Sequence, residues 1–231
     1  MSLSTSFEKV IELLDERMKD ASIDLRFLLN RRYDKARAIK FVGNKYQLDK
    51  SERHILYRAL YSNDEITAIK KKLVPFEQIS GKLLAVDGYN VLITVESILY
   101  KKTIIECDDG ILRDVSGVFG SHVITSVTKK SIDLILSQIA KYPPESLQFF
   151  FDSQVSKSGE LSNSIREKMN ELQLNGDAET VKQVDTTLKK LNCDIVATSD
   201  TIIIAQASAV VDIPQRILKN LNFPISFLML S

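Results

Sequence analysis

Apolar and polar positions follow a repeating order in the second part of the chain, after about residue 80. Four short apolar segments each end at an aspartate, and a helix-like or loop segment follows. The segments cover residues 83–86, 147–151, 180–184 and 195–199, and the aspartates after them are Asp87, Asp152, Asp185 and Asp200. This alternation predicts an α/β fold with a mainly parallel sheet. Because the carboxyl ends of parallel strands meet at one edge of a sheet, we expect the four carboxylates to converge there.

The segments between these strands carry helical patterns or turn signals. Glycines and serines between Ile111 and His122 predict a loop. A short strand is predicted at Thr103–Cys107 and an edge strand at Ser226–Leu230. Helices are predicted over Val91–Tyr100, Ser131–Ala140, Leu161–Leu174, Thr186–Leu191 and Pro214–Leu218.

The first part of the chain has helical periodicity. Apolar residues recur every three or four positions from Phe7 to Met18, after Ser6, whose hydroxyl can cap the helix. Pro75 and Gly81 mark the boundary to the strand-rich part. The sequence therefore predicts a small all-helical N-terminal domain, residues 1–78, followed by an α/β domain, residues 79–231. Further helices of the first domain are predicted over Ile23–Leu29, Asp34–Val42 and Asp49–Tyr61.

The net charge of +1 is unevenly distributed along the chain. Residues 1–80 carry a balance of +4 and residues 81–231 a balance of −3. Basic helix–turn–helix units often bind nucleic acid, because lysine and arginine displace counterions condensed on the phosphates. An ordinary helical hairpin also presents a solvated basic face, so both interpretations stay open. The candidate RNA-binding residues are Arg31, Arg32, Lys35, Arg37, Lys45, Arg53 and Arg58.

The cysteines and the lengths of the apolar runs indicate the cellular compartment that we expect for the protein. Cys107 and Cys193 form no CxxC pattern and have no neighbouring histidine, so we expect free buried thiols rather than a zinc site. The first ten residues lack the apolar core of a signal peptide, and no apolar run approaches the roughly 20 residues of a membrane span. We expect a soluble, cytoplasmic protein with no membrane partner. Its oligomeric state is open, with a homodimer as one option.

The four aspartates at the predicted sheet edge suggest a metal site. Several carboxylates in one place repel each other unless a cation lies among them. Carboxylate oxygens suit Mg²⁺ or Mn²⁺, which take remaining ligands from water and substrate phosphates. A metal held by Asp87, Asp152, Asp185 and Asp200 could activate water and neutralise the charge on a phosphodiester. Each of these aspartates is also a candidate N-cap for the helix that follows it.

Polar neighbours of these acids add candidate substrate ligands. Asn90 lies one helical turn after Asp87, where its amide could orient a water or contact a phosphate. Thr198 and Ser199 precede Asp200 and could hydrogen-bond its carboxylate or a substrate oxygen.

Short motifs around the acids resemble those of a known nuclease superfamily. The VDGYNV segment, Val86–Val91, and the TSD segment, Thr198–Asp200, are similar to motifs of the PIN-like nucleases, and in particular of their NYN branch. The resemblance implies an α/β/α domain whose acids bind Mg²⁺ or Mn²⁺ for RNA cleavage. At the matching positions it implies catalytic roles for Asp87, Asn90, Asp185 and Asp200.

The whole chain also resembles a mainly archaeal two-domain family of uncharacterised proteins. The segments RFLLNRRY and AIKFVGNKYQL are similar to its DUF434-type N-terminal domain. The segments VDGYNVLITVES and CDDGILRDVSGVFGSH are similar to its DUF5616-type C-terminal domain. This resemblance implies no particular activity.

The second of these segments contains a polar loop with its own candidates. Asp109 and Arg113 could form part of a substrate-binding lid, or Arg113 could pair with Asp109 or Asp114 in a structural ion pair. His122 is a further candidate general base, although a lone histidine is more often a structural hydrogen-bonding residue.

Together these features favour a metal-dependent endoribonuclease, in which a basic helical domain holds RNA and the acidic edge hydrolyses it. The alternative is a non-catalytic RNA- or ribosome-binding protein with the same fold. A phosphatase of the haloacid dehalogenase kind needs a second acid two residues after its nucleophile, and Tyr89 occupies that position. Nucleotide-cofactor binding is not favoured, because Gly117 and Gly120 do not form a GxGxxG motif after a strand.

Overall fold

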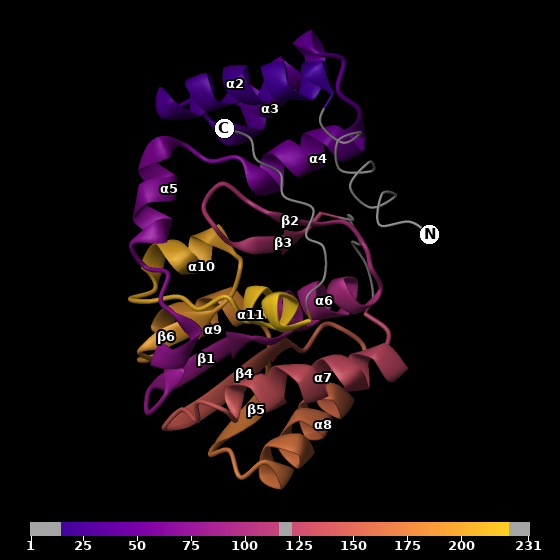
Figure 1. The fold of residues 1–231 in the computed structure, drawn as a ribbon, viewed down its shortest axis with the longest axis vertical. Coiled ribbons are helices and arrows are strands. Elements are labelled where there is room, and N and C mark those ends of the chain that lie inside the picture. The colour runs from indigo at the N-terminus through magenta and orange to yellow at the C-terminus, as the bar shows by residue number, and fades with distance from the viewer. Residues whose placement is uncertain (1–14, 116–121, 222–231) are drawn as a thin grey trace. The chain divides into compact units, whose positions relative to one another are not determined.

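The computed structural model describes residues 15–115 and 122–221. The described chain divides into two compact units (Figure 1). The helical unit contains residues 15–71 together with residues 103–115, and the sheet unit contains residues 72–102 and 122–221. Most of the helix predicted from Phe7 to Met18 and the whole edge strand predicted at Ser226–Leu230 lie outside the described residues.

The helical unit has four helices that begin at well-formed caps. Asp15, Asp34, Asp49 and Ser62 each accept a backbone N–H from the first turn that follows. Side-chain caps of this kind stabilise a helix by about 1 kcal/mol each. Helices are present at the three predicted places, although the first begins at Glu16 rather than Ile23, and a fourth helix that was not predicted follows them. The helices are α2 (Glu16–Asn30), α3 (Lys35–Lys45), α4 (Lys50–Ala59) and α5 (Asn63–Lys70).

A β-hairpin completes the core of the helical unit. The strands β2 (Ile104–Glu106) and β3 (Leu112–Asp114) pair antiparallel, with Gly110 at a positive φ of 87° in the turn between them. The predicted loop from Ile111 was therefore wrong for the residues of β3. Apolar hairpin residues join the same buried cluster as side chains of α2, α3 and α4. The helical unit thus contains a two-stranded sheet as well as helices. The hairpin contributes Ile105, Cys107 and Val115 to that cluster.

The sheet unit is built on four parallel strands in the order β5-β4-β1-β6 (Figure 1). Their register pairs Asp87 with Phe150 and Val86 with Ala197. The prediction of a mainly parallel sheet is confirmed. The strands are β1 (Leu83–Asp87), β4 (Ser146–Asp152), β5 (Gly176–Val181) and β6 (Ile195–Ala197).

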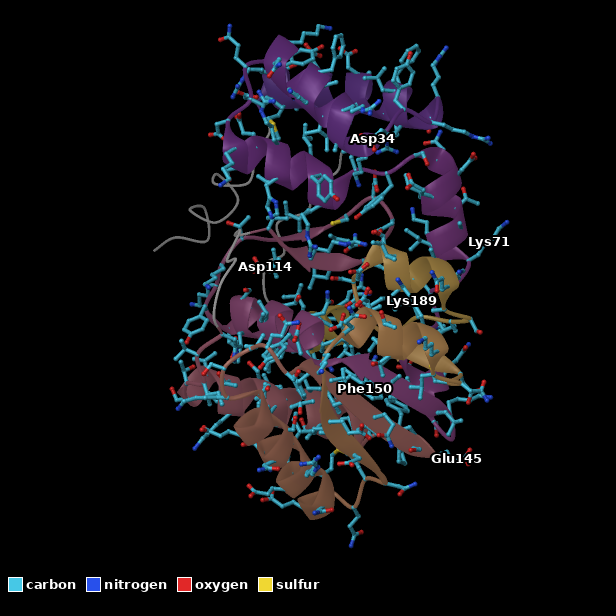
Figure 2. All side chains as sticks on the ribbon, turned by 180° about the vertical axis from the view of Figure 1, so that it is seen from behind. Asp34, Lys71, Asp114, Glu145, Phe150 and Lys189 are labelled. Carbon is cyan, nitrogen blue, oxygen red and sulfur yellow. The ribbon has the colours of Figure 1, made fainter. Side chains whose placement is uncertain are left out.

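Helices cover both faces of this sheet. Leu84 and Val86 of β1 join one buried cluster, while Ala85 between them joins another, as alternation along a strand requires. The first cluster includes side chains of α6, α7, α8 and α11, and the second includes Leu188 of α9 and Ile203 of α10. Figure 2 labels Phe150 on the sheet and Lys189 on α9, which belongs to the second layer. The helices are α6 (Gly88–Leu99), α7 (Ser126–Ile139), α8 (Ser158–Glu171), α9 (Val184–Lys190), α10 (Thr201–Gln206) and α11 (Ile213–Asn220), after a short 3₁₀ helix, η1 (Phe76–Ile79).

The edge strand β5 begins four residues earlier than the sequence predicted. Gly176 starts it at a φ of 144°, and a Cβ at this position would lie 1.9 Å from the carbonyl oxygen of Leu147. Only glycine lets the backbone of β5 approach β4 so closely. Because β5 ends at Val181, Asp185 does not end a strand and instead lies in the first turn of α9.

Gly176→Ala should destabilise the sheet unit by roughly 2 kcal/mol or more, since it combines backbone strain with a clash against the neighbouring strand. The matched control is Gly159→Ala in α8, where an added Cβ meets nothing within 4 Å. The control should be neutral or stabilise by up to about 1 kcal/mol, because alanine favours helix. Urea denaturation of the two variants measures both values. Equal stability of the two variants would contradict the proposed close approach.

Candidate functional site

The carboxyl ends of β1 and β6 form a switch point of the sheet. Strands β4 and β5 lie on one side of β1, and β6 lies on the other side. In open α/β sheets, ligands bind in the crevice outside the strand ends at such a point. Asp87 is the last residue of β1, and Thr198, Ser199 and Asp200 follow β6 directly. Asn90 joins these four residues through its hydrogen bond with Ser199. Five of the predicted site residues therefore lie at the ends of these two strands.

Hydrogen bonds connect the two strand ends. The hydroxyl of Thr198 donates to Oδ2 of Asp87 at 3.0 Å and accepts the backbone N–H of Asp200 at 3.1 Å. Oδ1 of Asn90 accepts two bonds from Ser199, from the backbone N–H at 2.8 Å and from the hydroxyl at 2.9 Å. Thr198 and Ser199 are buried, so these bonds fix the orientation of both the Asp87 carboxylate and the Asn90 amide.

Asp87 has an unusually high pKa for an aspartate. Desolvation raises its pKa from 3.8 to about 7, and the negative charges of Asp200 and Asp185 act in the same direction. The hydroxyl of Thr198 and the backbone amide of Asn90 lower the pKa but only partly offset the increase. The carboxylate is thus held where its ionised form lacks a full complement of favourable partners.

The other three predicted metal ligands have local partners. Asp200 caps α10 by accepting the backbone N–H of Ile202 at 2.7 Å, and Asp152 accepts that of Gln154 at 2.8 Å. Asp185 is exposed and lies 3.7 Å from the ammonium of Lys189. The capping alternative therefore applies to Asp200, while Asp152 stabilises a local turn after its strand.

The register of the sheet separates Asp152 from Asp87. Phe150, not Asp152, pairs with Asp87, so Asp152 lies two residues, or about 7 Å, further along its strand. Within residues 15–115 and 122–221, no three histidine, cysteine or acidic residues form a group that could hold a metal ion. Asp185 and Asp200 lie near enough for their charges to act on Asp87, so a metal site that these acids share stays a prediction. Mg²⁺ commonly takes only one or two carboxylates, with waters and substrate phosphates completing its shell, and Asp87 with Asp200 fits that donor set.

The seven predicted RNA-binding residues divide into an exposed group and a half-buried group. Arg31, Arg32, Arg37 and Lys45 are exposed. The guanidinium of Arg31 lies 3.7 Å from the centre of the Phe27 ring, and Lys45 forms a 2.6 Å ion pair with Asp24. The half-buried members are Lys35, Arg53 and Arg58.

Arg53 stabilises the turn between α3 and α4. Its guanidinium donates to the carbonyl oxygens of Leu48 at 2.8 Å and Lys40 at 3.4 Å, and to the side chain of Asn44 at 3.1 Å. A Cβ on Gly43 would lie 2.6 Å from this guanidinium, so the glycine makes room for it. These contacts give Arg53 a structural role in the hairpin of helices.

The hairpin β2–β3 forms a buried ionic cluster with the helices of its unit. Arg113 donates to both carboxylate oxygens of Asp109, at 2.8 and 2.6 Å, and neither side chain is more than 1% exposed. The ammonium of Lys35 lies 3.7 Å from the centre of the Tyr61 ring, and burial lowers its pKa to about 8. Asp109 and Arg113 thus form the structural ion pair that the sequence left open, and substrate binding by them stays a prediction.

His122 contacts a residue that sequence reasoning missed. Its Nε2 lies 3.1 and 3.0 Å from the two carboxylate oxygens of Glu96 on α6. Glu96 is a single acid inside the otherwise uncharged helix from Gly88 to Leu99. That isolated charge was the feature of the sequence that could have identified Glu96 as a candidate.

The fold and site define the sheet unit as a three-layer α/β domain with a desolvated acid at its switch point. The family described as "Domain of unknown function (DUF5616)" matches residues 76–216, and this chain belongs to that family. The family described as "Protein of unknown function (DUF434)" matches residues 17–72. The two matches confirm the two-domain resemblance seen in the sequence.

One relative matches most of this chain. "Uncharacterized protein MJ0935" of Methanocaldococcus jannaschii is 39% identical over 187 residues, which cover 81% of this chain and 88% of the relative. No solved structure matches the chain. Across the described ranges, no helix combines the length and apolar character that crossing a bilayer requires.

Asp87→Asn should stabilise the protein at alkaline pH. Between about pH 4 and pH 7 the folded state keeps a proton that the unfolded chain has released, so the aspartate contributes less to stability as pH rises through this window. Asparagine carries no charge and can still accept the hydrogen bond from Thr198. We expect the free energy of unfolding to rise by about 1–3 kcal/mol at pH 8 and to be unchanged near pH 4.

Urea denaturation at the two pH values measures this difference. The control is Asp133→Asn, which removes an exposed carboxylate 3.1 Å from Lys168 and should stabilise the protein at neither pH. A loss of stability in Asp87→Asn at pH 8 would contradict the prediction.

Proposed function

We propose that the protein is a metal-dependent ribonuclease that hydrolyses phosphodiester bonds of RNA at the carboxyl ends of β1 and β6. The observation that carries the proposal is the carboxylate of Asp87, held at the switch point with its pKa raised to about 7. A desolvated carboxylate beside other acids favours a cation. The similarity of the VDGYNV and TSD segments to PIN-like nucleases of the NYN branch supports the same function.

Each polar residue of the site has a role in this proposal. Bound Mg²⁺ or Mn²⁺ would activate water and neutralise charge on the phosphodiester. Asp87 and Asp200 would hold the ion, and Thr198 keeps the Asp87 carboxylate in one orientation through its hydroxyl. Because Ser199 donates twice to Oδ1 of Asn90, the Nδ2 amide of Asn90 is turned away and can donate to a phosphate oxygen.

The helical unit would bind the RNA strand. Exposed cations and exposed aromatic rings occur together on it, as in proteins that combine phosphate contacts with base stacking. Phe27, Tyr33 and Phe41 are 53%, 58% and 66% exposed. The contributing cations are Arg31, Arg32, Arg37 and Lys45.

Specific observations favour a second candidate function, a non-catalytic RNA-binding protein. Asp200 and Asp152 both accept local backbone N–H groups, as structural residues do. The described residues also lack a group of three metal-ligating side chains. RNA binding without hydrolysis in Mg²⁺ or Mn²⁺ would support this function over the first.

Asp87→Asn should reduce Mn²⁺-dependent cleavage of single-stranded RNA by roughly 100-fold or more, because it removes the charge that holds the ion. RNA affinity should stay within about twofold of the unchanged protein, since the exposed cations of the helical unit would supply most phosphate contacts. Cleavage of a labelled oligonucleotide and fluorescence anisotropy measure the two quantities. Asp133→Asn again serves as the control and should cleave normally. Full activity of Asp87→Asn would refute the proposed site.

Replacing Arg31 and Arg37 together by glutamine should weaken binding of single-stranded RNA and reduce its salt dependence. Each lost phosphate contact lowers the slope of log affinity against log salt by about 0.7. The matched control replaces Lys129 and Lys130, two exposed lysines of the sheet unit, by glutamine and changes the net charge equally. Equal effects of the two double variants would mean that only overall charge matters.

A further inference from the structure

His122 and Glu96 form a buried histidine–carboxylate pair in the sheet unit. The imidazole Nε2 lies within 3.1 Å of both oxygens of Glu96, and the two side chains are only 7% and 10% exposed. Glu96 also accepts a 2.5 Å bond from the hydroxyl of Thr128, which in turn accepts the backbone N–H of Thr125 at 3.0 Å. Because an ionised carboxylate only accepts hydrogen bonds, this arrangement places a proton on Nε2.

The other nitrogen of His122 is buried but has no partner. Nδ1 of His122 and the hydroxyl of Tyr89 are both buried polar atoms without a hydrogen-bond partner among the described residues. The two rings are in contact, with centroids 5.4 Å apart. Buried polar atoms are nearly always paired, so two unpaired atoms on adjoining rings point to a polar group supplied by a ligand.

The ring pair adjoins the acidic site. Tyr89 lies two residues after Asp87 in the first turn of α6, and its ring packs edge-on against Phe151 of β4 at 5.2 Å. The phenolic hydroxyl of Tyr89 can both donate and accept a hydrogen bond. Thr198 and Ser199 lie toward β6, whereas Tyr89 lies toward β4. The site thus has polar groups on both sides of the end of β1.

We propose that Tyr89 and His122 form the leaving-group side of the hydrolytic site, and this inference rests on the proposed function. When water attacks phosphorus, a new P–O bond forms and the bond to the leaving oxygen breaks. The electron pair goes to the leaving oxygen, which takes the proton from Nδ1 of the protonated imidazole. The proton of the attacking water passes to solvent, and solvent then restores the proton on His122.

Glu96 is a positioning residue in this scheme. It fixes the ring so that Nδ1 faces the ligand, in the way that carboxylates orient histidines elsewhere. The hydroxyl of Tyr89 donates to the same substrate oxygen or to a neighbouring phosphate oxygen, which gives both buried atoms a partner.

Substrates with different leaving groups test the proton transfer. We expect His122→Ala to reduce Mn²⁺-dependent cleavage of an RNA oligonucleotide by about 100-fold, since its alkoxide leaving group needs a proton. Hydrolysis of bis(p-nitrophenyl) phosphate should fall by less than about threefold, because p-nitrophenolate leaves without one. Added imidazole should restore part of the RNA cleavage. His54→Ala, which changes the other of the two histidines, is the matched control and should affect neither substrate.

The outcomes separate this inference from the function on which it rests. If the unchanged protein hydrolyses neither substrate, both the function and the inference fail. If it hydrolyses both and His122→Ala loses the same factor on each, or loses nothing, only the proton-donor role is refuted. His122→Asn, which keeps a polar side chain of similar reach, repeats the comparison should the alanine variant not fold.

A spectroscopic measurement tests the role of Glu96 independently of activity. The ¹⁵N chemical shifts of neutral His122 should report a proton on Nε2 in the unchanged protein. In Glu96→Gln that preference should weaken, and RNA cleavage should fall by about tenfold while bis(p-nitrophenyl) phosphate is little affected. A proton on Nδ1 of neutral His122 in the unchanged protein would overturn the proposed orientation.

Discussion

Desolvation of the Asp87 carboxylate is the constraint on which the chemistry of the sheet unit depends. β1 is flanked by β4 and β6, and both of its faces are covered by apolar clusters, so the acid at its end is largely removed from water. The hydroxyl of Thr198 donates a hydrogen bond to this carboxylate, whereas the negative charges of Asp200 and Asp185 repel its ionised form. Such an environment lowers stability at neutral pH, and residues of this kind are typical of sites that bind a ligand.

The parts of the fold that could be predicted from the sequence are those buried on both sides. β1, β4 and β6 are almost continuous apolar runs, and such runs are recognisable without any knowledge of their neighbours. The edge strand β5 has exposed Glu179 and Thr180, and it begins where Gly176 fits against the backbone of Leu147. That approach is a tertiary contact, so the pattern alone misplaced the strand. The three-residue strand β3 was missed because it is defined by its pairing with β2 across the turn at Gly110, and not by its own pattern.

The residues of the candidate site also divide into those that the strand pattern predicts and those that depend on tertiary contacts. Asp87, Asn90, Thr198, Ser199 and Asp200 could be predicted because they follow strands that meet at a switch point. The positions of Asp152 and Asp185 could not be predicted in the same way, because they depend on strand register and on the length of the segment after β5. Glu96 and His122 are 26 residues apart, and only the packing of α6 beside the start of α7 brings them together. No periodicity in the sequence reports that contact.

The structure also changes the charge argument for RNA binding. The sequence assigns its basic excess to the first part of the chain, but the hairpin belongs to the helical unit and residues 103–115 hold four acids and one arginine. Asp108 and Asp109 neutralise arginines within that unit, and Lys35 is enclosed with a lowered pKa. The net charge of the unit is therefore a poor measure of its affinity for phosphates. What matters is the smaller exposed set around Arg31 and Arg37, where a cation and an aromatic ring can act on the same nucleotide.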